Sequence, residues 1–157
     1  MRLNERQLSE IRRLLNHIAL PQGLMVPEQF LLKYILVEAL LRYVLDQFGR
    51  QIEKDRPTSS SHSPLRIDSV RKALTSFHVR IPTNCLDLLL DSKRKARGVK
   101  SARNLRNGLV HAWDANDTQE VIDREAELMA ALSTFLSTFD IYSQRGTPNV
   151  LDVKDNI

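Results

Sequence analysis

Two side chains able to move a proton and to hold a phosphate lie five residues apart in the segment SARNLRNGLVHAWDAND, residues 101–117. His111 can carry a proton near neutral pH, and Arg106 can bind a phosphate group and stabilise charge on it. Asn107 can orient either group. RNA supplies its own nucleophile, the 2′-hydroxyl. A base and a cation at the phosphate therefore suffice for strand cleavage without a metal.

Residues 99–113 are predicted to form a helix, and its geometry separates these side chains. At ~100° per residue, Asn107 and His111 are ~40° apart and share one face, whereas Arg106 lies ~140° from His111. Arg103 and Lys100 continue the His111 face upstream. The opposite arc is apolar and is expected to face the core. Its members are Val99, Ala102, Leu105, Leu109, Val110 and Trp113.

Arg106 falls within this apolar arc, where a charge needs compensation. Its side chain either extends to solvent, or pairs with a carboxylate such as Glu38, or lies on an arc that is not all core. Glu38 lies in an apolar helix and is expected to pair with an arginine of another helix; orienting a site residue is the alternative. Gly108 costs about 1 kcal/mol in mid-helix relative to alanine. Its presence indicates the close approach of another backbone.

Positive charge is concentrated before and within this segment. Residues 1–113 hold 20 Lys and Arg against 10 Asp and Glu, whereas residues 114–157 hold 3 against 9. No acidic residue lies between Asp91 and Asp114. A field of one sign favours a polyanionic partner; a solvated surface facing the acidic C-terminal part is the alternative. The residues expected to bind such a partner are Lys95, Arg97, Lys100 and Arg103, with Lys93 and Arg94 in the same run.

The 157 residues suffice for one domain with its own core. The single cysteine, Cys85, excludes an internal disulfide and is expected to be buried packing. No apolar run is long enough to span a membrane, and we expect a cytoplasmic protein. No set of residues has metal-ligand spacing and no glycine-rich phosphate loop is present, so no metal or cofactor is expected.

Hydrophobic periodicity predicts an all-α bundle of about five helices and no convincing strand. Helices are expected at 4–19, at 28–48 with Gly49 as its end, at 65–79, at 99–113, and from Asp117 or Thr118 to about Tyr142, with a short helix after Pro82. The polar segment EKDRPTSSSHSP, which contains His62, is predicted to be a loop. One domain is expected at 1–143, followed by a tail at 144–157.

The segment RNGLVH, from Arg106 to His111, resembles the signature of the HEPN superfamily. That signature is an arginine, a polar residue, a few residues and a histidine, on a late helix of a four- to five-helix bundle. The resemblance implies a homodimer with two motifs facing each other. It also implies a metal-independent endoribonuclease that leaves a 2′,3′-cyclic phosphate, as in many toxins and antiphage proteins. Arg106 and His111 would be the catalytic pair, oriented by Asn107, and the arginine of one protomer could approach the other protomer's histidine.

One position departs from this pattern. Some HEPN toxins carry a tyrosine two residues after the motif histidine, which a nucleotidyltransferase antitoxin modifies. Trp113 occupies that position here, so this form of neutralisation cannot occur at this site. Trp113 is expected in the core, with base stacking as the alternative. Arg103-Asn104 repeats the Arg-Asn pair, but its spacing to His111 is too long for the motif.

These observations predict a dimeric HEPN-type endoribonuclease that acts on RNA, possessing an antitoxin partner if it is a toxin. Two alternatives remain open. In one, the same helix docks RNA or a protein in a non-catalytic dimeric module. In the other, the domain is purely structural.

Overall fold

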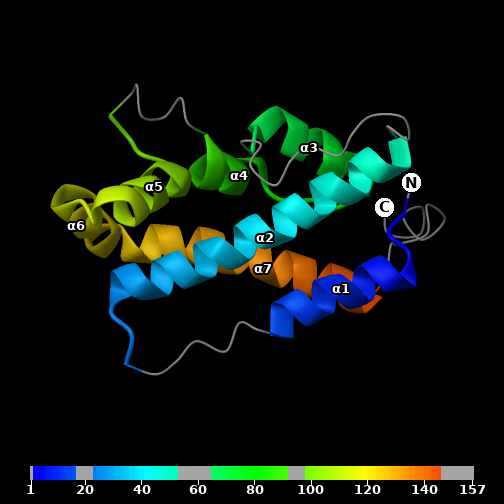
Figure 1. The fold of residues 1–157 in the computed structure, drawn as a ribbon, viewed down its shortest axis with the longest axis horizontal. Coiled ribbons are helices and arrows are strands. Elements are labelled where there is room, and N and C mark those ends of the chain that lie inside the picture. The colour runs from blue at the N-terminus through cyan, green and yellow to red at the C-terminus, as the bar shows by residue number, and fades with distance from the viewer. Residues whose placement is uncertain (1, 17–22, 53–64, 92–97, 146–157) are drawn as a thin grey trace, which may run out of the picture.

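The fold is an all-α helical bundle, as the sequence predicts (Figure 1). The computed structural model describes residues 2–16, 23–52, 65–91 and 98–145, except for the side chains of 52 and 142–145. These residues form seven helices and no strand. The helices are α1 (Glu5–Leu15), α2 (Val26–Ile52), α3 (Ile67–Ser76), α4 (Thr83–Leu90), α5 (Ala102–Ala112), α6 (Ala115–Asp123) and α7 (Glu125–Arg145).

Helix α2 is central and packs against α1, α3, α5, α6 and α7. The prediction that Gly49 ends this helix is wrong, because α2 continues through Gly49 to Ile52. Phe48 is buried and packs edge-on against Phe77 of the α3 end, with ring centroids 6.4 Å apart. This packing offsets the ~1 kcal/mol cost of one helical glycine.

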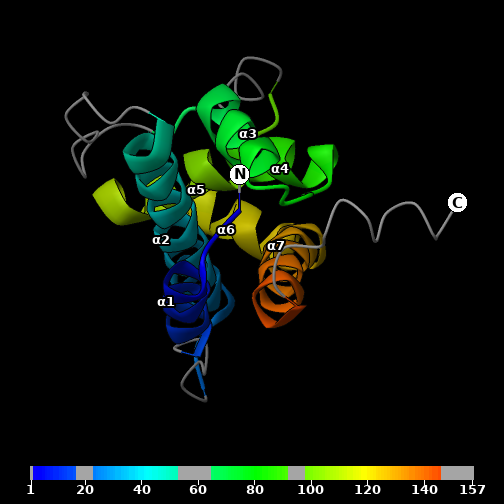
Figure 2. The same ribbon diagram turned by 90° about the vertical axis from the view of Figure 1, so that its right-hand side faces the viewer.

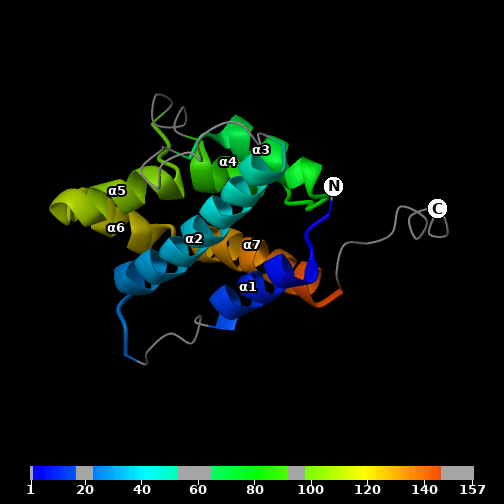
Figure 3. The same cartoon turned by 45° about the vertical axis from the view of Figure 1, so that its right-hand side comes forward.

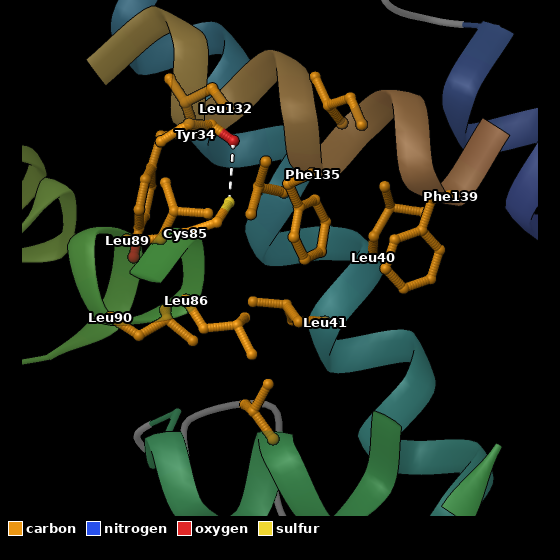
Figure 4. Close-up of a cluster of buried hydrophobic side chains, with 14 of the residues drawn as sticks. Tyr34, Leu40, Leu41, Cys85, Leu86, Leu89, Leu90, Leu132, Phe135 and Phe139 are labelled. Carbon is orange, nitrogen blue, oxygen red and sulfur yellow. Dashed lines mark hydrogen bonds between the residues drawn. The ribbon is translucent and has the colours of Figure 1, made fainter. Parts of the chain in front are cut away.

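Helices α3 and α4 lie together on one side of the α2–α7 pair and α1 lies on the other (Figures 1 and 2). Side chains of α2, α4 and α7 meet in the core, where Leu89, Phe135 and Phe139 are fully buried (Figure 4). Cys85 lies among them, and its thiol donates a hydrogen bond to the Ala131 carbonyl at 3.2 Å. Burial raises the pKa of this thiol. Cys85 is therefore a packing residue, as predicted.

Helices α5 and α6 stack at one end of the molecule (Figure 3). The prediction of one long last helix that begins at Asp117 or Thr118 is wrong. Asp114 caps α6 by accepting a hydrogen bond from the Asp117 amide at 2.9 Å. Arg124 then separates α6 from α7, with φ −107° and ψ 20°, outside the helical range.

The other helix boundaries differ from prediction by a few residues. Asn4 caps α1 in a capping box with Gln7, as expected. The third predicted helix, 65–79, is shorter as α3, and α4 follows Pro82. The structure does not describe residues 17–22, 53–64, 92–97 and 146–157. His62 lies in the second of these ranges, and the last holds most of the expected tail. The third range contains the basic run, which is Lys93, Arg94, Lys95 and Arg97. None of the described helices combines the length and apolar composition needed to cross a membrane.

Adjacent residues of α7 test this packing. Leu132 is fully buried and Ser133 is exposed. We expect Leu132→Ala to lower the free energy of unfolding by about 2–5 kcal/mol, because it leaves a cavity in the core. Ser133→Ala should change it by less than about 0.5 kcal/mol. Urea denaturation of the full chain measures both, and equal effects would contradict the orientation of α7.

Candidate functional site

The motif lies on α5, and local side-chain bonds define where this helix begins and ends. Ser101 is fully buried and forms a capping box with Asn104. The backbone N–H of Asn104 donates to the serine hydroxyl at 3.3 Å. The helix ends at Trp113, whose φ of 44° is left-handed. Such a conformation is rare for a bulky residue. It reverses the chain so that α6 packs back against α5.

Gly108 makes room for a carboxylate rather than for a backbone, which corrects the sequence prediction. A Cβ atom at Gly108 would lie 2.7 Å from Cγ of Asp117, on the first turn of α6. Asp117 is 6% exposed, and its carboxylate accepts a hydrogen bond from the Lys100 ammonium. This bond raises the pKa of Lys100. Lys100, expected to bind substrate, is thus paired within the chain.

Arg124 ties the start of α5 to the α6–α7 junction. Its Nη1 donates to the Lys100 carbonyl at 2.7 Å, and its Nε donates to Glu127 at 3.0 Å. Glu120 lies 3.6 Å from the same guanidinium. These contacts join α5 to the acidic C-terminal part of the chain. Some of the acidic residues there therefore form ion pairs within the protein.

Arg106 pairs with Glu38 of α2, which is one of the three alternatives that the sequence left open. Its Nη2 lies 3.6 Å from Glu38 Oε2, while Arg42 Nη2 donates to Glu38 Oε1 at 2.8 Å. Arg106 Nη1 also donates to Asn107 Oδ1 at 3.0 Å, so the asparagine side chain contacts one end of the guanidinium. The Arg106 Nε is buried and has no hydrogen-bond partner among the described residues. The guanidinium is thus held on two sides.

These groups surround a small cavity, which we call the α2–α5 pocket. Its volume is about 100 Å³. It is lined by Tyr34, Glu38, Arg42, Leu65, Arg103, Arg106 and Asn107. Arg103 Nη1 donates to the Leu65 carbonyl, which ties α5 to the segment before α3. Burial and the Glu38 charge raise the pKa of Tyr34, so its hydroxyl stays protonated.

His111 does not line the α2–α5 pocket. Its imidazole is exposed on the last turn of α5, with no hydrogen-bond or ion-pair partner in the described part of the chain. One α5 helix separates Arg106 and His111 by ~140° around its axis and ~7.5 Å along it. The structure therefore brings Arg103, Arg106 and Asn107 together and leaves His111 apart.

The predicted core arc of α5 is only partly buried. Ala102, Leu105 and Leu109 are buried as expected, but Val99 is 45%, Val110 is 49% and Trp113 is 52% exposed. The prediction that Trp113 lies in the core is wrong, because the left-handed turn at the helix end directs its side chain outward. The arc that includes Arg106 is thus not all core.

Sequence reasoning missed Tyr34 and Arg42 as members of the site. Both share a face of α2 with Glu38, because residues four apart are ~40° apart on a helix. The spacing Tyr-x₃-Glu-x₃-Arg, polar groups in an otherwise apolar segment, was the available signal. The sequence analysis named Glu38 as a candidate partner of Arg106 but did not use this spacing, so Tyr34 and Arg42 were not included.

Among the described residues, no three or more His, Cys, Asp or Glu side chains gather so as to hold a metal ion. No family model matches the chain, and neither a curated protein nor a solved structure shows detectable similarity to it. The function is therefore inferred from the geometry of the site.

The two interior helical glycines allow a matched test of the Asp117 contact. We expect Gly108→Ala to lower the free energy of unfolding by about 1–3 kcal/mol, because the methyl group displaces a buried carboxylate from Lys100. Gly49→Ala, where no atom lies within 4 Å of the added Cβ, should raise it by up to about 1 kcal/mol. Urea denaturation measures both. In an Asp117→Ala background the penalty at Gly108 should shrink, and an unchanged penalty would contradict the proposed contact.

The alkaline stability of the protein tests the environment of Tyr34. Its raised pKa means that the neutral phenol contributes stability below the ordinary tyrosine pKa of about 10, which is lost as the pH rises further. We therefore expect Tyr34→Phe to lose less stability than the wild type between about pH 9 and pH 11. Urea midpoints across this range measure the loss. Tyr43→Phe, at a partly exposed position, is the control, and a larger rescue by Tyr43→Phe would contradict the assignment.

Proposed function

We propose that this protein is a metal-independent endoribonuclease of HEPN type that acts as a homodimer. The observation that carries the proposal is that one helix presents an oriented guanidinium, Arg106, beside a polar pocket and an accessible imidazole, His111, on a second face. Neither side chain is fully buried in the core. The Arg106–Asn107 bond supports the role that the resemblance to the HEPN signature gives to Asn107.

In the proposed reaction, His111 accepts the proton of an RNA 2′-hydroxyl as that oxygen attacks the adjacent phosphorus. The bond from phosphorus to the 5′-oxygen of the next nucleotide breaks, that oxygen takes a proton from water as it leaves, and His111 returns its proton to the solvent. The products are a 2′,3′-cyclic phosphate end and a 5′-hydroxyl end. Arg106 stabilises the negative charge that develops on the phosphoryl oxygens, and Asn107 holds Arg106 in place.

A second copy supplies the missing proximity of the two catalytic groups. The beginning of α2 and the end of α5 lie at the same end of the molecule (Figure 1). Large exposed apolar side chains occur on α2, α5, α6 and the turns beside them; they are Met25, Leu32, Ile35, Val110, Trp113 and Ile122. In the proposed dimer, some of these side chains would form the contact between the two copies. A two-fold axis there would place one protomer's Arg106 near the other's His111.

The remaining basic residues differ in what they can offer RNA. Arg103 lines the α2–α5 pocket, and its one described contact is to a neutral carbonyl. The charge of Lys100 is compensated by Asp117, so Lys100 is the weakest of the expected substrate-binding residues. Lys95 and Arg97, outside the described residues, retain the role that their charge suggests. A toxin role with a protein antitoxin belongs to the same proposal, and growth arrest on expression that Arg106→Ala relieves would support it.

The proposal predicts cleavage of single-stranded RNA in the presence of EDTA, with 2′,3′-cyclic phosphate ends. His111→Ala and Arg106→Ala should each lower the cleavage rate by about 10²-fold or more, because each removes a group that acts in the transition state. Electrophoresis of labelled RNA measures the rate. The matched control is His78→Asn. His78 is also exposed, and its own φ is positive, a conformation that asparagine adopts more readily than most residues. This variant should cleave RNA normally. Binding without cleavage would favour the non-catalytic module instead.

Mixing the two inactive variants tests the composite site. A mixed dimer keeps one site with both Arg106 and His111 only if these residues act across the interface. We then expect about a quarter of the wild-type rate, because half the dimers are mixed and each retains one of two sites. No recovery from mixed dimers would show that the pair acts within one chain, and a monomer by light scattering would contradict the dimer.

A further inference from the structure

The α2–α5 pocket has the size and charge of a site for a single phosphate group. Its volume is about 100 Å³, whereas pockets for larger organic ligands begin at about 300 Å³. One water molecule occupies about 30 Å³ in the liquid. The pocket therefore has room for a few waters or one tetrahedral anion.

The pocket carries an excess of positive charge. Three guanidiniums, of Arg42, Arg103 and Arg106, face one carboxylate, that of Glu38. Glu38 pairs with Arg42 and Arg106. Arg103 has no carboxylate partner in the part of the chain that the structure describes, since its guanidinium donates only to the Leu65 carbonyl. Guanidinium groups bind phosphate oxygens through paired, charge-assisted hydrogen bonds. Among the described residues that line the pocket, arginines thus outnumber carboxylates by two.

Tyr34 adds a neutral hydrogen-bond donor to the lining of this pocket. The residue is 2% exposed, and its hydroxyl has no hydrogen-bond partner among the described residues. A phenol hydroxyl can donate a hydrogen bond to a phosphate oxygen. The hydroxyl is therefore available to a molecule in the pocket.

We propose that the α2–α5 pocket binds a phosphate group that carries two negative charges, either inorganic phosphate or the phosphomonoester end of an RNA strand. A dianion matches the excess of two arginines over carboxylates among the described lining residues, whereas an internal phosphodiester carries only one charge. Arg103 and Tyr34 are the binding residues specific to this site. Binding of an RNA strand end rests on the proposed ribonuclease function, whereas binding of inorganic phosphate does not.

Titration of the full chain with inorganic phosphate at constant ionic strength, with chloride as the reference anion, tests the pocket. We expect a saturable rise in Tm. Arg103→Gln should weaken phosphate binding by about tenfold or more, because a charge-assisted donor is lost. Tyr34→Phe, which keeps the buried ring, should weaken it by about two- to tenfold. Arg80→Gln, at an exposed arginine away from the pocket, should leave it unchanged. A phosphate effect that is absent, or equal in Arg103→Gln and the wild type, overturns the proposal.

Three oligoribonucleotides of one sequence distinguish the two sources of phosphate. They carry a 5′-phosphate, a 3′-phosphate or hydroxyls at both ends, and binding is measured with His111→Ala to prevent cleavage. Tighter binding of one phosphorylated strand, lost in the Arg103→Gln double variant, assigns the pocket to that strand end. Phosphate binding with no preference among the strands assigns it to the free anion. RNA cleavage without any effect of phosphate would overturn phosphate binding in the pocket and leave the ribonuclease proposal standing. Phosphate binding without RNA cleavage would support the pocket and overturn the ribonuclease proposal.

Discussion

Glu38 carries a charge on the helix against which most of the bundle packs, and that charge has to be compensated where α2 meets α5. Its two carboxylate oxygens are divided between Arg42 of its own helix and Arg106 of α5. Side-chain pairs with this exposure contribute little to stability, about 0–1 kcal/mol. Their consequence is positional, because Glu38 draws Arg106 toward α2. The pocket exists because polar side chains meet at a helix contact that is otherwise apolar.

The orientation of α5 depends on a second set of contacts, made from the opposite side. The Asp117 carboxylate occupies the space that a side chain at Gly108 would fill and holds Lys100. Arg124 binds the Lys100 carbonyl from the α6–α7 junction. Together these bonds fasten the beginning and middle of the motif helix to the C-terminal helices. The acidic C-terminal part of the chain thus positions α5, as well as balancing its charge.

The separation of Arg106 from His111 limits the chemistry that these two side chains of one chain can perform together. A rigid helix places the two side chains on different faces, and the anchoring of α5 on two sides leaves no simple rotation that would bring them together. The imidazole of His111 and the apolar side chains of Val110 and Trp113 are exposed at the end of α5. The α2–α5 pocket is lined by residues of α2, α5 and the segment before α3.

Hydrophobic periodicity predicted the all-α class, the central helix and the motif helix, because these features depend on local spacing. Local rules failed where packing outweighed propensity. Gly49 did not end α2, since Phe48 is buried beside it. The last helix divided at Arg124, whose side chain binds three neighbouring groups. Trp113 adopted a left-handed turn that no residue-type preference favours, and its side chain became exposed.

The sequence by itself determined the helical fold class, the face of α5 that holds Asn107 and His111, and the need of Glu38 for an arginine. Each follows from spacing along one chain segment and from the cost of an uncompensated charge. Only the tertiary structure decided that Tyr34 and Arg42 join Arg103 and Arg106 in one pocket, that Lys100 is taken by Asp117, and that His111 stays outside. Such pairings join residues from different helices, and the crossing of two helices depends on the whole core rather than on either segment.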